Sequence, residues 1–171
     1  MATQTPFTDT RRFKVMRTVV GATNPLMVRL LGSRFAGPMG KNLMLLRFTG
    51  RTSGRVFTTP VGYVREGDRV VVVTSPTYRW WKNIRDRAAV DVHLDGAWRH
   101  GRARVVPPTD PAFDEAVALQ VRGRGPGMLR GFGVPVDDAG RITDADRSSL
   151  DQKALIVTID LVADRLVDAA A

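Results

Sequence analysis

The middle of the chain changes its hydrophobic period, and this change most narrows the range of folds. Leu43 to Phe48 is a short apolar run, Val56 to Val64 is rich in β-branched residues, and Val70 to Thr74 continues the pattern. The sequence REGDR supplies a reversal between the last two runs. Together these runs predict a β-meander.

A second group of β segments follows. Trp80 to Arg87 lacks strict alternation and predicts one short helix. The next segment alternates as a half-buried strand does. Its apolar face holds Val90, Val92 and Leu94, and its polar face holds Asp91 and His93. The Asp-Gly pair in LDGAW is a strong hairpin signal, so we expect Trp98 to Val106 to be the partner strand.

The C-terminal third combines a helix, a loop and a strand. Phe113 to Val121 has helical spacing, with Asp110 as the expected cap and Pro111 in the first turn. Gly123 to Arg147 is rich in Gly, Pro and Asp, and we expect a mobile loop there. The run KALIVTIDLV has no polar face, so we expect a closing strand that pairs inside the sheet.

The N-terminal segment has a helical period. Between Phe7 and Phe35 apolar residues recur at helical spacing, and Asn24–Pro25 divides the segment into two expected helices. The first helix is basic and amphipathic, as is typical of helices that lie on anionic lipid. Its basic residues are Arg11, Arg12, Lys14 and Arg17, and its apolar residues include Phe13, Met16 and Val20.

These elements fit a single domain. About six strands with a few helices predict a mainly β (α+β) fold, as an antiparallel barrel or sandwich. We expect an N-terminal helical segment in residues 1–40, a barrel core in 43–106, a helix and lid loop in 109–147 and a closing strand in 153–163 of one domain spanning 1–171.

Charge is unevenly distributed along the chain. The net charge is +9, from 26 Lys and Arg against 17 Asp and Glu. Residues 1–106 are basic, whereas residues 107–171 hold more acids than bases. This distribution indicates an anionic partner, which would be a phosphorylated cofactor, a membrane surface or nucleic acid. A solvated basic surface would have the same composition.

Several classes of site lack support in the sequence. There is no cysteine, so disulfides and thiolate metal sites are excluded and a reducing cytoplasm is the expected compartment. No apolar run reaches the ~18 residues of a membrane span, so we expect a soluble or peripheral protein. His93 and His100 have no carboxylate cluster beside them in the sequence, so we expect exposed histidines and no metal site.

The segment TGRTSGRVFTTP, from Thr49 to Pro60, is the strongest candidate for a functional site. A plain hairpin needs only the glycines, yet Arg51 and Arg55 border the tight turn formed by residues 52–54. Small residues in a turn expose successive backbone N–H groups, and arginines add fixed charge, so the two together suit a phosphate. A surface hairpin with two solvated arginines would have the same sequence.

The segment TSPTYRWWKN begins about fifteen residues after this one and holds two adjacent tryptophans. Neighbouring side chains on a helix point about 100° apart. Because of that angle, Trp80 and Trp81 cannot both enter the core in the same way. One indole is therefore expected along a groove or against a partner. The alternative is that both indoles wedge the helix onto the sheet at different edges.

The order of several motifs resembles a known family. NPLMVRLLG, LMLLRFTGRTSGRVFTTPVGYV, GDRVVVVTS, WWKNIR and VDVHLDG occur in that order before a closing apolar strand. This order resembles the actinobacterial deazaflavin-dependent nitroreductase and quinone reductase family, over roughly Asn24 to Val106 and the last strand. The resemblance implies a split β-barrel, usually a homodimer. It also implies binding of the reduced deazaflavin coenzyme F420 and hydride transfer to quinones, nitro compounds or other electron-poor acceptors.

The resemblance implies a cofactor site as well. The coenzyme's phosphate and tail would meet the bend at Arg51, Thr52, Ser53, Gly54 and Arg55. The deazaflavin ring would lie beside Phe57, Thr58, Thr59, Pro60, Val61 and Gly62. The ring edge would meet Val73, Thr74, Ser75 and Pro76, with the Ser75 hydroxyl as the one candidate catalytic group. The site would be closed by Arg79, Trp80, Trp81, Lys82 and Asn83, with an indole packed on the ring.

Three positions depart from the family pattern. Thr52 and Pro76 stand where lysine is common, and Phe57 stands where arginine is common. The cations that would compensate are Arg55, Arg79 and Lys82.

These departures leave alternatives open. FMN is the alternative cofactor, and a module that binds anionic membranes without redox chemistry is the alternative function. Nucleic acid is disfavoured because no recognised nucleic-acid-binding motif occurs. The only tyrosines are Tyr63 and Tyr78, so the resemblance assigns no proton donor.

Overall fold

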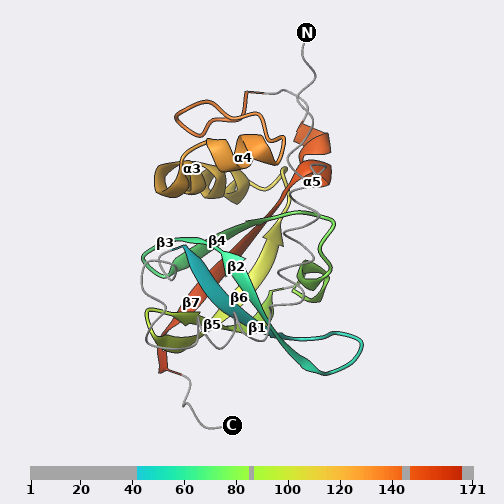
Figure 1. Ribbon diagram of the computed structural model, residues 1–171, viewed down its shortest axis with the longest axis vertical. Coiled ribbons are helices and arrows are strands. Elements are labelled where there is room, and N and C mark those ends of the chain that lie inside the picture. Colours follow the sequence, from blue (N-terminus) through green and yellow to red (C-terminus); the bar gives the residue numbers. More distant parts are fainter. Residues whose placement is uncertain (1–41, 85–86, 144–146, 167–171) are drawn as a thin grey trace.

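A seven-stranded antiparallel sheet forms the body of the protein (Figure 1). The computed structural model describes residues 42–84, 87–143 and 147–166. The strands are β1 (Leu43–Thr49), β2 (Val56–Gly62), β3 (Val64–Glu66), β4 (Arg69–Thr74), β5 (Ala88–Leu94), β6 (Ala97–Val106) and β7 (Leu155–Leu166). Two of these strands come from the run at 56–64, which was expected to form one strand and instead divides at Tyr63.

The order of the strands closes the sheet into a barrel. The order is β2-β1-β5-β6-β7-β4-β3, so β2 and β3 form opposite edges although Tyr63 alone separates them in the chain. The sheet therefore curls until its two edges meet in one continuous segment, which is the expected split β-barrel. The predicted meander is right for the pairs β1–β2 and β3–β4, but β4 finds its second partner in β7, far along the chain.

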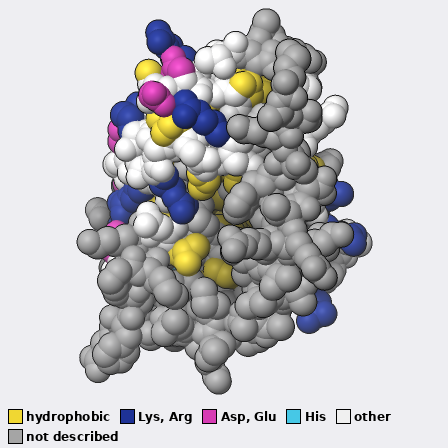
Figure 2. Space-filling model, turned by 45° about the horizontal axis from the view of Figure 1, so that its top comes forward, with side chains coloured by type: hydrophobic (Ala, Val, Ile, Leu, Met, Phe, Trp, Pro, Cys, Tyr) yellow, Lys and Arg dark blue, Asp and Glu magenta, His cyan; other side chains and the backbone are white. Residues whose placement is uncertain are grey.

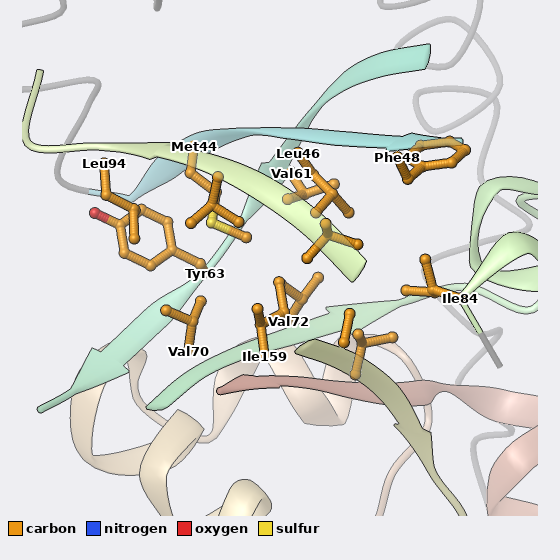
Figure 3. Close-up of a cluster of buried hydrophobic side chains, with 14 of the residues drawn as sticks. Met44, Leu46, Phe48, Val61, Tyr63, Val70, Val72, Ile84, Leu94 and Ile159 are labelled. Atoms are coloured by element: carbon orange, nitrogen blue, oxygen red, sulfur yellow. The ribbon is translucent and has the colours of Figure 1, made fainter. Parts of the chain in front are cut away.

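The interior of the barrel is a hydrophobic core (Figure 3). Alternate residues of each strand point inward, because successive side chains of a strand point to opposite faces. In the close-up, Phe48 and Ile84 lie at one end of the cluster, and Tyr63 and Leu94 lie at the other. The buried members are Met44, Leu46, Phe48, Val61, Tyr63, Val70, Val72, Ile84, Val90, Val92, Leu94, Ala103, Val157, Ile159 and Leu161.

A second core lies between the outer face of the sheet and the helices α3 (Ala112–Arg124), α4 (Gly127–Gly131) and α5 (Leu150–Lys153), which gather at one end of the molecule (Figure 1). The carboxamide of Gln120 ties α3 to the sheet by donating to the Val71 carbonyl, at 2.9 Å. In β7, Ile156 enters this core while Val157 enters the barrel, so the closing strand is covered on both faces as predicted.

Local signals for turns and caps are confirmed. Asp95 and Gly96 have φ angles of 53° and 80°, and they join β5 to β6 in the predicted hairpin. The Asp110 carboxylate accepts the Ala112 N–H at 2.9 Å and so caps the start of α3. The expected helices between Phe7 and Phe35 lie outside the described residues.

Two other predictions need correction. The helix expected over 80–87 is a single 3-10 turn, η2 (Trp80–Asn83), because Ile84 is drawn into the barrel core and Arg87 has a positive φ of 54°. The segment 123–147 is not a featureless loop. It contains α4 and buries Leu129 completely, and 147–149 form the short helix η3 (Arg147–Ser149).

Ion pairs join the helical layer to neighbouring segments on the surface. Arg69 contacts Glu115 at 3.1 Å, and Arg122 contacts Glu66 at 3.2 Å. Figure 2 shows basic and acidic side chains interspersed along one side of this face. Exposed pairs of this kind contribute about 0–1 kcal/mol each. Within the described ranges no helix is both long and apolar enough to cross a membrane.

Candidate cofactor site

The bend between β1 and β2 is closed by its own backbone. The Gly50 N–H donates to the Arg55 carbonyl and the Gly54 N–H donates to the Gly50 carbonyl, both at 2.8 Å. Gly54 has a φ of +65°, a conformation that side-chain-bearing residues rarely adopt. The Ser53 hydroxyl accepts the Arg55 N–H at 3.3 Å. Backbone groups and the Ser53 hydroxyl make these bonds, and none of them involves a guanidinium.

The helix η2 is anchored by the two indoles in different ways. Trp80 packs against the barrel core, with its ring centroid 6.5 Å from that of Phe48. Trp81 is half-buried and its Nε1–H donates to the Pro76 carbonyl at 3.3 Å. The Lys82 ammonium lies 5.7 Å from the centre of the Trp81 ring. Both indoles are half-buried, and they differ in that Trp80 packs against the core, whereas Trp81 bonds to the Pro76 carbonyl.

Asn83 joins the bend to η2. Its side-chain Oδ1 accepts the Arg51 N–H at 3.1 Å, and its Nδ2 donates to the Trp80 carbonyl at 3.0 Å. The two segments that were singled out separately in the sequence are therefore in direct contact. The bend does not point into empty solvent away from the tryptophans.

A pocket of about 490 Å³ lies between the bend and η2. Its lining contains three cations and no acid. Within the described ranges neither Arg79 nor Lys82 forms an ion pair with a carboxylate. Like charges grouped in one hollow favour a bound anion, which their fields jointly attract. The lining residues are Arg51, Thr52, Arg79, Lys82 and Asn83.

A model of the F420H(2)-dependent quinone reductase family matches residues 15–125, which is more than half of the chain. The chain belongs to this family. It is therefore an oxidoreductase, and its cofactor is coenzyme F420.

The fold of this reductase recurs in solved structures. An F420-H2 dependent reductase (FDR-A) is 17% identical, with a TM-score of 0.50 over 70% of this chain and 95% of that one. The heme storage protein HutZ from Vibrio cholerae is 11% identical, with a TM-score of 0.50 over 83% and 92%. A structure described as a domain-swapped dimer is 15% identical, with a TM-score of 0.50 over 85% and 98%. At these identities the likeness concerns the fold alone. No curated protein matches the chain.

The pocket of the reductase fits the anionic part of the cofactor. Two guanidinium groups, an ammonium and a hydroxyl are donors of the kind that bind phosphate oxygens. Arg79, just before η2, and Lys82, within it, line the pocket together with Arg51 of the bend, and these are two of the cations expected to compensate for Thr52, Phe57 and Pro76. The described part of the chain contains no metal-binding group of three or more histidine, cysteine or acidic side chains.

The predicted cofactor residues between Ser53 and Gly62 do not line this pocket. Ser53, Gly54 and Arg55 complete the bend without lining the pocket. Phe57 is 42% exposed and stacks on Phe48, with ring centroids 5.8 Å apart. The remaining β2 positions, Thr58, Thr59, Pro60, Val61 and Gly62, pair with β1, and Val61 is buried in the barrel core.

The segment 73–76 of the reductase is largely buried. Val73 packs in the core beneath the helices, and Thr74 is 5% exposed. Ser75 is 1% exposed, and its hydroxyl lies 2.8 Å from the Thr77 hydroxyl and accepts the Thr77 N–H at 3.2 Å. The Ser75 hydroxyl is thus engaged in holding the turn before η2.

Sequence reasoning missed a second group of polar residues on the outside of the barrel. His100 Nδ1 lies 2.6 Å from Asp91 Oδ1, and Arg47 lies 3.9 Å from the other oxygen of Asp91. They line a pocket of about 260 Å³. The register of the Asp95–Gly96 hairpin, which places Asp91 opposite His100, could have revealed the pair. The same register places His93 opposite Trp98, and His93 is buried rather than exposed as predicted.

Proposed function

We propose that the reductase holds F420 through the pocket between the bend and η2, and passes a hydride to a quinone, a nitro compound or a similar electron-poor acceptor. The observation that carries the proposal is the pocket itself, with three cations and no acid in its lining. Arg51 and Thr52 would hold the phosphate and tail from one side. Arg79 and Lys82 would hold them from the other.

The hydride chemistry is supplied by the reduced deazaflavin when it is bound. The contribution of the chain is to bind, orient and exclude water. Phe57, at the start of β2 beside the bend, offers an exposed aromatic face for a flat ring. Trp81, held by its bond to the Pro76 carbonyl, lies half-buried between Trp80 and the pocket residue Lys82 in the chain. Tyr63 is neutral at physiological pH, as tyrosines ordinarily are. Burial raises the pKa of its hydroxyl further.

A binding titration tests the proposal. Purified protein titrated with F420 should show quenching of tryptophan fluorescence with micromolar or tighter affinity, because indoles flank the pocket. FMN serves as the comparison ligand. Oxidation of reduced F420 is then followed with menadione and with a nitroimidazole as acceptors. Absence of any fluorescence or calorimetric response to F420 would remove the proposal.

The proposal includes a homodimer. Val56 is 63% exposed and Phe57 is 42% exposed, and both lie on β2, an edge of the sheet. An exposed apolar edge strand favours pairing with another chain. One structure with this fold is described as a domain-swapped dimer, which supports a second copy as the partner. Light scattering coupled to size exclusion should give twice the chain mass, and Val56→Lys should shift it toward the monomer.

A further inference from the structure

The pocket is assembled from two segments that are far apart in the sequence, and one side chain connects them. Arg51 and Asn83 are 32 residues apart, yet the Arg51 N–H donates to the Asn83 carboxamide oxygen at 3.1 Å. The other end of the same carboxamide donates to the Trp80 carbonyl. Asn83 therefore lines the pocket and uses both ends of its side chain in contacts within the protein.

The two segments differ in how firmly they are held. η2 is followed directly by Ile84, which is completely buried, and Trp80 packs on the barrel core. The residues from Arg51 to Phe57 are all exposed, and the bonds that close the bend connect bend residues to one another. Asn83 thus links an exposed bend to an anchored helix.

Electrostatics acts against this arrangement when no anion is bound. Arg51, Arg79 and Lys82 all line one hollow, and like charges at close range repel each other even where water screens them. Loss of the Asn83 contact would weaken the hold on the bend and let the cations move apart. An anion would then have to draw the bend back, and its affinity would fall because ordering the site opposes binding.

We propose that Asn83 is a positioning residue: it fixes the Arg51 backbone against η2 and so holds Arg51 at the correct separation from Arg79 and Lys82 for one phosphate group. This inference rests on the proposed function for the identity of the anion. Asn83 acts through Arg51. Its carboxamide oxygen cannot donate to an anion, and its nitrogen is oriented toward the protein by the bond that one N–H makes to the Trp80 carbonyl.

The test uses Asn83→Ala in the full chain, with Asn42→Ala as the matched control because Asn42 is an exposed asparagine outside the pocket. Amide hydrogen exchange, measured by NMR on protein without cofactor, should become at least about tenfold faster at Arg51 in Asn83→Ala and stay unchanged in Asn42→Ala. The thermal midpoint should fall by no more than about 8 °C, which corresponds to the loss of two hydrogen bonds, one exposed and one partly buried.

Affinity for F420, measured by calorimetry, should fall about tenfold in Asn83→Ala. If Asn83 acts through Arg51, the double variant Arg51→Ala/Asn83→Ala should bind as weakly as Arg51→Ala alone, since a coupled pair is not additive. Fold-losses that multiply in the double variant would overturn the inference, as would unchanged exchange at Arg51. Failure of the natural protein to bind F420 would instead overturn the proposed function, and exchange at Arg51 would still decide whether Asn83 holds the bend.

Discussion

The imidazole of His93 lies edge-on against the indole of Trp98, with ring centroids 5.2 Å apart. The Arg47 guanidinium stacks over the same indole at 4.0 Å. His93 is 9% exposed, so burial lowers the pKa of its imidazole. The positive charge of Arg47 lowers the pKa further, while a hydrogen bond with the Gly96 backbone opposes the shift. The cluster therefore favours a neutral His93.

This shift predicts loss of stability in mild acid. The pKa of histidine in the unfolded chain is about 6.5, and the folded value is lower, so the unfolded state binds more protons once the pH falls below about 6.5. The contribution of His93 is complete above that pH and is lost as the pH falls toward the folded value. We therefore compare urea midpoints at about pH 7.5 and about pH 5.5, one on each side of the unfolded pKa. The difference between the two midpoints should be smaller in His93→Gln than in the natural protein.

Arg51 and Arg55 border the same bend but should differ in their importance for binding. Only Arg51 lines the pocket, whereas the Arg55 guanidinium lies 5.9 Å from the Phe57 ring centre. We expect Arg51→Ala to weaken F420 binding at least tenfold, about 1.4 kcal/mol. Arg55→Ala removes the same charge as a matched control, and we expect a loss below about threefold. Equal losses in calorimetric titrations would show that net charge, rather than the pocket, attracts the cofactor.

The two indoles should differ in their contributions to stability. Trp80→Ala removes a ring packed on Phe48, and we expect a loss of about 3 kcal/mol, at the low end for such substitutions because the ring is half-buried. Trp81→Phe removes the N–H that donates to the Pro76 carbonyl, for which we expect about 1 kcal/mol. Urea unfolding measures both. A larger loss for Trp81→Phe than for Trp80→Ala would contradict this assignment of the anchoring indole.

Gly101 marks a close approach of β6 to β7. A Cβ at this position would lie 2.8 Å from the Ile159 Cγ2 and 3.1 Å from the Asp160 carbonyl oxygen. We expect Gly101→Ala to destabilise the fold by about 1–3 kcal/mol, as overpacked cores do. Gly127→Ala is the control, because nothing lies within 4 Å of its added Cβ. We expect it to be neutral or slightly stabilising in α4. The thermal midpoint should fall in Gly101→Ala and should stay unchanged or rise slightly in Gly127→Ala.

Local sequence signals predicted much of the secondary structure. The Asp95–Gly96 hairpin, the Asp110 cap and the β7 strand follow from turn chemistry and hydrophobic period, which act over a few residues. The break at Tyr63 could not be read in this way, because the residues on both sides of it favour a strand. The break arises where one segment leaves β1 for β4 as the barrel closes. The helix α4 was missed for a related reason, since Leu129 finds its apolar partners only in the packed layer.

The sequence by itself determined the strands, the tight turns, the basic bend and the family of this reductase, because these depend on residue types and spacings within short windows. Only the tertiary structure decided that Arg51 meets Asn83, that Arg79 and Lys82 line one pocket with the bend, and that His93 is buried. The physical reason is that pockets and burial depend on which distant segments the curled sheet brings together. The spacing of apolar side chains within one segment does not show which distant segments will lie next to it.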